Sequence, residues 1–459
     1  MDQQKTHRDF KAPRLKVAPV QLIVLGYLLF AVAGTILLSL PVSLQPGVEL
    51  SFIDALFSAT SAISVTGLTV VNTPDTFNFF GRCILIFLFQ FGGIGIMTLG
   101  TVIYVFLGNK ISLRERMMIR TDQNQPSLQG MVYLMLFIFK VALIFELVAT
   151  AILTAHFYFN HHLLFWNALG LAFFHSISGF TNAGFDLFGN SLQGFTPDYL
   201  IQAVIGTLIL AGAIGFPVLL ELYTNIIEKR PWKKLRFSLY TKVTVITYGI
   251  LLLAGFMLIL LFEASGPLAN MPWHQKIAVA AFQSLTTRSS GFSTVDVGVF
   301  HSVTLLFCCL LMFIGSSPSS CGGGIRTTTF AVNILSTLAI FRGQSNTKIF
   351  RRELLQDDIF KALTVFFVAT ALLSSSVMVL AQTELFSLKE LLFEACSAFG
   401  TTGLSLGITG GLTTTGKAIL ILLMFTGRIG LVTLFLIFRK KRPPDKDKYH
   451  YVKERIIIG

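Results

Sequence analysis

One pattern occurs four times in this sequence, as SAISVTGLTV at residues 61–70, SISGFTNAGFDL at 176–187, SLTTRSSGFSTV at 284–295 and SAFGTTGLSL at 397–406. Each copy holds a glycine followed by Leu or Phe, namely Gly67, Gly184, Gly291 and Gly403. Successive glycines are 117, 107 and 112 residues apart. Self-similarity at a nearly fixed period indicates internal repeats, so the sequence predicts four unequal copies of one unit.

The surroundings of these glycines define the unit. Each glycine is preceded by an amphipathic stretch, at 53–64, 165–178, 277–287 and 388–399. Stretches of this length are too short to span a bilayer, which needs about 20 apolar residues. A second glycine follows 24 to 28 residues later, at Gly92, Gly212, Gly315 and Gly427. Each unit therefore reads as a long helix, a half-helix, a glycine loop and a second long helix.

Composition places these units in a membrane. Hydrophobic residues make up 53% of the 459 residues and charged residues only 13%, whereas soluble domains carry roughly 25% charged residues. Apolar runs of spanning or near-spanning length occur at 22–40, 134–153, 204–222, 243–261 and 363–380, and 84–105 reaches that length by including glycines. The sequence predicts an all-α polytopic membrane protein with eight transmembrane helices and four re-entrant pore loops around one pseudo-fourfold pore.

The expected organisation follows from this count. We expect a cytoplasmic arm at 1–18 and a cytoplasmic tail at 441–459. Between them lie repeat 1 at 19–110, repeat 2 at 111–236, repeat 3, whose second helix is broken, at 237–345, and repeat 4 at 346–440.

Positive charge gathers in the arm, near 110–120, 229–236 and 342–352, and after 439, with a net charge of +13. By the positive-inside rule these clusters are cytoplasmic, as are both termini. Nucleic-acid binding is disfavoured because no recognition motif accompanies the charge; anionic lipid is an expected contact. An enzyme is disfavoured as well, since no catalytic cluster of His, Cys or carboxylates occurs in the apolar segments. A scaffold or receptor would not need four matched loops, and we expect no organic cofactor.

Four non-helical loops at membrane depth require an explanation. Unpaired backbone N–H and C=O groups are tolerated there only when they are buried in protein or line a water-filled cavity. Loops around a common axis can direct their carbonyls at a cation and replace its water shell. Only the glycine is common to all four copies, which favours backbone coordination. The predicted K+ selectivity filter is Val65, Thr66, Gly67, Asn182, Ala183, Gly184, Ser289, Ser290, Gly291, Thr401, Thr402 and Gly403. The alternative is four ordinary turns between helices.

The third repeat contains a helix-breaking segment, GSSPSSCGGG at 315–324. Glycine costs about 1 kcal/mol and proline about 3 kcal/mol in a helix interior relative to alanine. We expect an irregular loop below the filter; the alternative is a simple kink. The expected loop consists of Gly315, Ser316, Ser317, Pro318, Ser319, Ser320, Cys321, Gly322, Gly323 and Gly324.

These motifs together resemble the Trk/Ktr/HKT superfamily of potassium transporters, and most of all the bacterial Ktr membrane subunit. The resemblance rests on the four glycines, GGIG and GRIG in the second helices, TTRSSGF, and GSSPSSCGGGIRT, and it covers residues 19 to about 440. It implies K+ uptake by a homodimer in the bacterial plasma membrane, with one pore per protomer and the 315–324 loop as an intramembrane gate. It also implies a cytoplasmic, nucleotide-binding RCK/KTN regulatory ring (KtrA/KtrC type).

Several charged residues keep two interpretations. Arg428, in an apolar run, is either a cationic brake on the gate or a partner of carbonyls or a carboxylate. Arg288 either faces the ion path or, more in keeping with its charge, ties down the pore helices. Asp54 and Glu394, on half-helices, either anchor them or attract cations. The histidines His161, His162 and His175 show no metal-ligand spacing and are interpreted as interface or core residues.

The transported ion also has an alternative. Glycine in all four loops favours K+, because every loop can then present its carbonyls in the same geometry. The competing function is a Na+-coupled or Na+-permeable carrier of the same fold.

Overall fold

A computed structural model describes residues 19–109, 111–123, 128–227, 237–344 and 346–438. The predicted arm and tail, Lys110 and the basic cluster at 229–236 lie outside the described residues.

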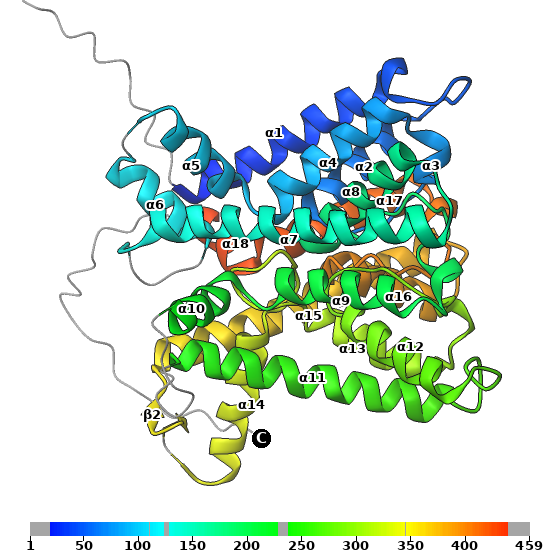
Figure 1. The fold of residues 1–459 in the computed structure, drawn as a ribbon. Helices are drawn as coiled ribbons and strands as arrows, with labels where there is room; N and C mark the ends of the chain where they lie inside the picture. The colour runs from blue at the N-terminus through cyan, green and yellow to red at the C-terminus, as the bar shows by residue number, and fades with distance from the viewer. Residues whose placement is uncertain (1–18, 110, 124–127, 228–236, 345, 439–459) are drawn as a thin grey trace, which may run out of the picture.

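The same succession of elements occurs four times along the chain (Figure 1). A long first helix is followed by a short helix, a glycine loop and a second helix; we call the short helix the pore helix after its predicted role. The first helices are α1 (Pro19–Ser39), α7 (Met131–Asn160), α11 (Leu239–Glu263) and α15 (Gln356–Thr383). The pore helices are α2 (Phe52–Ser64), α8 (Phe165–Thr181), α12 (Trp273–Thr286) and α16 (Leu388–Gly400). The second helices begin as α4 (Phe79–Gly93), α9 (Tyr199–Ala213), α13 (Ser302–Phe313) and α17 (Thr414–Ile429).

Each second helix is interrupted and then resumes, as α5 (Ile96–Phe106), α10 (Phe216–Ile227), α14 (Thr327–Phe341) and α18 (Leu431–Phe438). The α4–α5 and α9–α10 pairs bend by 97° and 101°. Gly95 and Gly215 lie at these bends with φ of +99° and +100°, a region that other residues rarely adopt. The sequence predicted a long second helix in each unit, and the structure divides the apolar runs 84–105 and 204–222 at these bends.

By length and composition alone, the described residues contain fewer than eight recognisable membrane spans. Among the described residues, the four first helices are long and apolar enough to cross a membrane, and the two bent pairs raise the number to six. Large apolar side chains on these helices face outward, and Leu29, Ile250 and Phe367 are 57%, 62% and 75% exposed. An apolar exterior on long apolar helices identifies a helical polytopic membrane protein.

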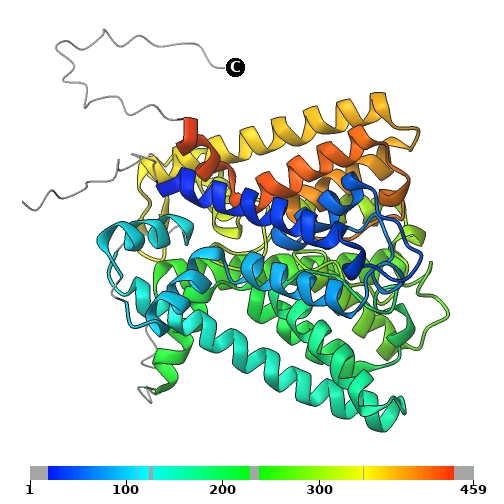
Figure 2. The same ribbon diagram turned by 90° about the horizontal axis from the view of Figure 1, so that it is seen from above.

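The repeats pack in a closed ring. The second helices α4, α9, α13 and α17 contact the pore helices of the following repeat, which are α8, α12, α16 and α2 respectively. The last of these contacts joins repeat 4 back to repeat 1. Figure 2 shows α17 (orange) beside the blue helices of repeat 1, although they are far apart in sequence.

Most described connections rich in Lys and Arg lie at one end of the molecule, on the left in Figure 1. We call it the basic end. It comprises α5, α6 (Leu113–Asp122), α10, the end of α14, and a hairpin of β1 (Lys348–Ile349) and β2 (Arg352–Glu353). Helix α1 contacts both α6 and α18, so the two ends of the described chain are close together.

Candidate functional site

The four glycine loops meet one another directly. A Cβ atom on Gly67 would lie 2.6 Å from the carbonyl oxygen of Ala183, and one on Gly184 would lie 2.1 Å from that of Ser290. The same relation holds between Gly291 and Thr402, at 2.3 Å, and between Gly403 and Thr66, at 2.2 Å. Each loop therefore contacts the next, and the fourth contacts the first.

The conformation of these loops requires glycine. The φ angles of Gly67, Gly184, Gly291 and Gly403 are +92°, +70°, +74° and +92°. A side chain in this region costs about 1–2 kcal/mol, and here it would also meet a neighbouring carbonyl. The four positions thus favour glycine for two reasons, the left-handed backbone conformation and the close approach of a carbonyl group from the neighbouring loop.

Three of the four loops leave their pore helix in the same way. Val65, Asn182 and Thr401 are left-handed caps that end α2, α8 and α16. The next N–H group in each loop returns to a carbonyl of its helix, as from Thr66 to Ser61 at 2.8 Å. The third loop differs, because the N–H groups of Ser289 and Ser290 both donate to the Thr286 carbonyl at 3.1 Å.

The loops follow the C-terminal ends of their pore helices, where the helix dipole is negative. The eight non-glycine residues of the predicted filter are buried. Several of their side chains engage neighbours; Thr66 Oγ1 lies 2.7 Å from Ser64 Oγ, and Ser289 Oγ donates to Asn182 Oδ1 over 3.3 Å. The structure brings all four predicted segments together.

The second glycine of each repeat allows close helix packing. Cβ atoms on Gly92, Gly212 and Gly427 would lie 2.0–2.2 Å from carbonyl oxygens near the ends of the pore helices, those of Ile63, Phe180 and Phe399. In the third repeat, Gly315 instead approaches the Gly323 carbonyl, at 2.0 Å. In repeats 1, 2 and 4, the regular spacing in sequence thus reflects contact between the second helix and its own pore helix.

Residues 315–324 form no helix and pass directly beside the glycine loops. A Cβ on Gly322 would lie 3.0 Å from Cβ of Ser289, and one on Gly323 would lie 2.5 Å from Oγ1 of Thr401. The segment is also tied to repeat 2, because the Cys321 N–H donates to the Gly212 carbonyl over 2.9 Å.

The serines and proline of this segment are held by further contacts. The hydroxyls of Ser316 and Ser320 lie 2.9 Å apart, and the Tyr240 hydroxyl donates to the Pro318 carbonyl over 2.7 Å. The N–H of Ser317 donates to the Ala213 carbonyl over 3.2 Å. These hydrogen bonds hold the polar segment in an ordered, non-helical conformation.

Arginine side chains donate hydrogen bonds to carbonyl groups of the segment. The guanidinium of Arg428 donates to the carbonyls of Cys321, Gly92 and Gly93, the last at 3.0 Å. Arg326, which the sequence analysis overlooked, donates to the Gly322 carbonyl. These contacts are compatible with both interpretations of Arg428. Its guanidinium pairs with carbonyl groups, and it also lies against the 315–324 segment.

The Arg288 side chain is buried and contacts the start of the 315–324 segment. It donates to the Gly315 carbonyl over 2.6 Å, and its guanidinium lies 4.5 Å from the centre of the Tyr248 ring. This contact joins the third glycine loop to the start of the 315–324 segment.

A cavity of about 130 Å³ lies on the basic-end side of the glycine loops. Pro318, Ser319, Arg326, Arg428 and Asp122 are among the residues that line it. Burial raises the pKa of Asp122 to about 6, against the lowering effects of the Gln123 side chain and of Arg428. The cavity therefore combines two guanidinium groups with one carboxyl group that titrates near pH 6.

The two half-helix carboxylates have partners. Asp54 accepts from Lys417 Nζ of α17 over 2.7 Å. Glu394 accepts from the Leu406 N–H and the Thr409 hydroxyl over 3.1 Å, just beyond the fourth glycine loop. Both contacts anchor a pore helix to another segment.

Sequence reasoning missed Asp122, Arg326 and a buried carboxyl group, Glu146 of α7, which accepts from Gln90 of α4 over 2.7 Å. An isolated acid within an apolar run was the available signal for Glu146. Asp122 and Arg326 lie in polar surroundings in the sequence, so nothing there distinguishes them.

Comparison with known proteins bears on what this arrangement does. Residues 9–449 match the TrkH family, which is described as cation transport proteins. The chain belongs to the TrkH family. Membership places it among membrane cation transporters and not among enzymes.

TrkH-family relatives resemble the chain over nearly its full length. It is 48% identical to the Ktr system potassium uptake protein D of Bacillus subtilis, covering 96% of this chain and 98% of the relative. It is 34% identical to the potassium/sodium uptake protein NtpJ of Enterococcus hirae, covering 98% of this chain and 99% of the relative. The crystal structure of the TrkH potassium transporter from Vibrio parahaemolyticus superposes on the chain with a TM-score of 0.71 at 19% identity. The superposition covers 95% of this chain and 87% of the transporter, which supports a shared TrkH fold.

Proposed function

We propose that this chain takes up K+ across the bacterial plasma membrane through one pore, whose selectivity filter is formed by the backbone of the four glycine loops. The observation that carries the proposal is the closed ring of contacts from Gly67 through Gly184 and Gly291 to Gly403. A full-length relative 48% identical to the chain is named a potassium uptake protein.

The proposed topology has eight spans in four repeats, at 19–110, 111–236, 237–345 and 346–440. Each interrupted second helix counts as one span. The basic end then faces the cytoplasm by the positive-inside rule, and both termini lie on that side.

The 315–324 segment is proposed as the gate. Its contacts with Ser289 and Thr401 set it beside two filter loops, and Arg428 holds it in place. A polar loop in this position blocks the path of an ion by its volume. Release of the Arg428 hydrogen bonds would let the segment withdraw toward the cavity.

Control of this gate is assigned to a partner. Two full-length relatives are named as proteins of a Ktr system, and the basic end presents Arg116, Arg120, Lys348, Arg351 and Arg352. We propose that a nucleotide-binding RCK/KTN ring docks there on a homodimer. Neutralising these residues should reduce co-purification with the ring in detergent, where lipid cannot compete.

Flux in proteoliposomes tests the function. Purified chain should carry K+ or Rb+ much faster than Na+ down an imposed gradient, and empty liposomes should carry neither. Equal Na+ and K+ flux, or none with folded protein, would contradict the proposal.

The second candidate is a Na+-coupled or Na+-permeable carrier, favoured by the relative named a potassium/sodium uptake protein. K+ flux that requires Na+ on the same side would identify this function. K+ flux that is unchanged when Na+ is replaced by choline would exclude coupling.

A further inference from the structure

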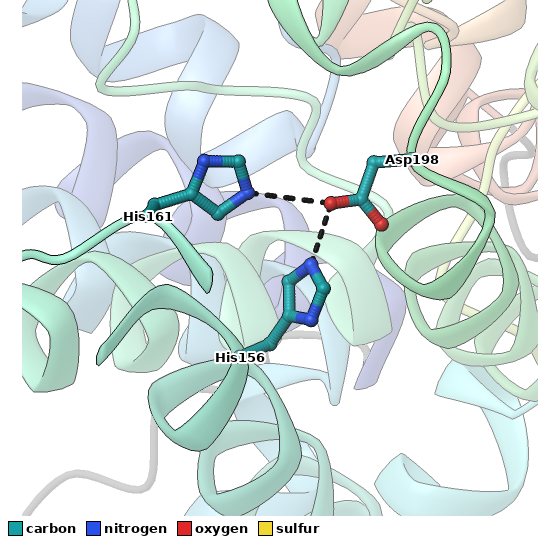
Figure 3. Close-up of side chains that lie close together, drawn as sticks. All are labelled: His156, His161 and Asp198. Carbon is teal, nitrogen blue, oxygen red and sulfur yellow. Dashed lines mark hydrogen bonds and ion pairs between the residues drawn. The ribbon is translucent and has the colours of Figure 1, made fainter. Parts of the chain in front are cut away.

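Two histidines and an aspartate converge in repeat 2, where α7 ends and α9 begins (Figure 3). This is the side of the molecule opposite the basic end (Figure 1). His156 lies near the end of α7, His161 is the residue that caps it, and Asp198 caps the start of α9. Their ligand atoms all lie within 4.8 Å of one another. His156 Nε2 lies 2.5 Å and His161 Nε2 lies 3.3 Å from the same carboxylate oxygen, Asp198 Oδ2.

The carboxylate is oriented so that one oxygen is left for the histidines. Asp198 Oδ1 accepts from the N–H groups of Leu200 and Ile201 over 3.1 and 3.2 Å. Oδ2 then points between the two imidazole rings, as Figure 3 shows. A ligand fixed in this way by backbone donors is a feature of built metal sites.

His156 is also prepared for ligation through Nε2. Asn160 Nδ2 lies 3.1 Å from His156 Nδ1. Rotation of the Asn160 amide by half a turn places its oxygen next to His156 Nδ1. The oxygen then accepts a hydrogen bond from Nδ1–H, which leaves the lone pair of His156 Nε2 free for a metal ion. The His161 side chain is 35% exposed, so an ion can enter from solvent and keep a water ligand.

We propose that His156, His161 and Asp198 bind a divalent transition-metal ion of the Zn2+ type, which joins the ends of α7 and α9. Zn2+ takes nitrogen and oxygen ligands at ~2.0–2.2 Å, which sets the ligand atoms of a tetrahedral site ~3.3 Å apart. The His161–Asp198 pair already has this separation, and the His156–Asp198 pair opens by less than 1 Å to reach it. Imidazole ligands favour Zn2+ over Ca2+ or Mg2+, which prefer all-oxygen sites.

The competing explanation is that the three side chains form a hydrogen-bonded cluster, which joins the ends of α7 and α9 without a metal ion. From the sequence, His161 is expected to be an interface or core residue. His156 and Asp198 are 42 residues apart, so their meeting was not visible from spacing. His162, the next residue along the chain, is exposed and outside the cluster, which makes it a matched control.

The test is Zn2+ binding to the full chain in detergent, purified without a polyhistidine tag. ZnCl2 should raise the thermal unfolding midpoint saturably, with one ion bound per chain by elemental analysis; CaCl2 should not. His162→Gln should behave as wild type. His161→Gln, which leaves the His156–Asp198 bond in place, and Asp198→Asn, which keeps an oxygen for the cap, should weaken binding by more than tenfold.

Asn160→Ala should weaken binding by about tenfold, the usual effect of losing an outer-shell partner. Absence of a saturable shift in the wild type would overturn the proposal and leave the hydrogen-bonded cluster. An equal shift in wild type, His161→Gln and Asp198→Asn would also overturn it, because the ion would then bind elsewhere.

Discussion

Replacement of Gly184 by serine should damage K+ selectivity while leaving the fold in place. A Cβ at this position would lie 2.1 Å from the Ser290 carbonyl oxygen, and Cβ atoms essentially never approach closer than 3.0 Å. One of the two loops must therefore move by at least 0.9 Å. The φ of +70° adds about 1–2 kcal/mol of backbone strain.

The strain sets the scale of the effect. If it is released by distorting the carbonyl ring, K+ affinity falls by a factor of about 5–30, the equivalent of 1–2 kcal/mol. The assay is Rb+ uptake into proteoliposomes at varied K+ and Na+. Apparent K+ affinity should fall by this factor, and Na+ should become a better competitor.

Two other glycines provide matched controls. Gly47 has a similar φ of +83° but no atom within 4 Å of an added Cβ, so Gly47→Ser carries the strain without the contact. Gly170, on pore helix α8, is equally uncrowded. Both controls should keep wild-type selectivity. Wild-type K+ affinity and selectivity in folded Gly184→Ser would refute the filter assignment.

Three further predictions concern the surroundings of the loops. Arg428→Gln should raise K+ flux about tenfold without a regulatory partner, because each charge-assisted hydrogen bond lost is worth ~1.5–3 kcal/mol; unchanged or lower flux would argue against a gate. Lys417→Met should lower the free energy of unfolding by about 1–3 kcal/mol by leaving Asp54 unpaired, with selectivity intact, as chemical denaturation and ion competition would show. Lowering the cytoplasmic pH from 7.5 to 5.5 should reduce K+ flux, because protonation of Asp122, whose pKa is about 6, leaves the cavity more positive; in Asp122→Asn this pH response should disappear.

The sequence predicted the parts of the fold that repeat. Four glycines in phase located the four glycine loops, because a left-handed φ and a close carbonyl disfavour every other residue. The pore helices were placed within four residues at each end, since short amphipathic stretches have clear limits in sequence. The 315–324 segment was expected to be irregular, and the structure describes no helix there.

The bends of the second helices escaped prediction for a physical reason. One glycine costs a helix only about 1 kcal/mol, so Gly95 and Gly215 did not outweigh the apolar runs around them. The bends depend on tertiary contacts: the Phe216 N–H donates to the Ser319 carbonyl over 2.8 Å, across more than 100 residues. Contacts of this range, like the approach of Asp122 to Arg428, leave no periodic trace in a single sequence.

The location of bound ions tests the central claim most directly. Crystals of the chain grown in Rb+ or Tl+ should show anomalous density on the axis enclosed by Gly67, Gly184, Gly291 and Gly403, and Gly184→Ser should weaken it. Ordered ions elsewhere in the membrane region, with none between the four loops of the folded wild type, would contradict the account.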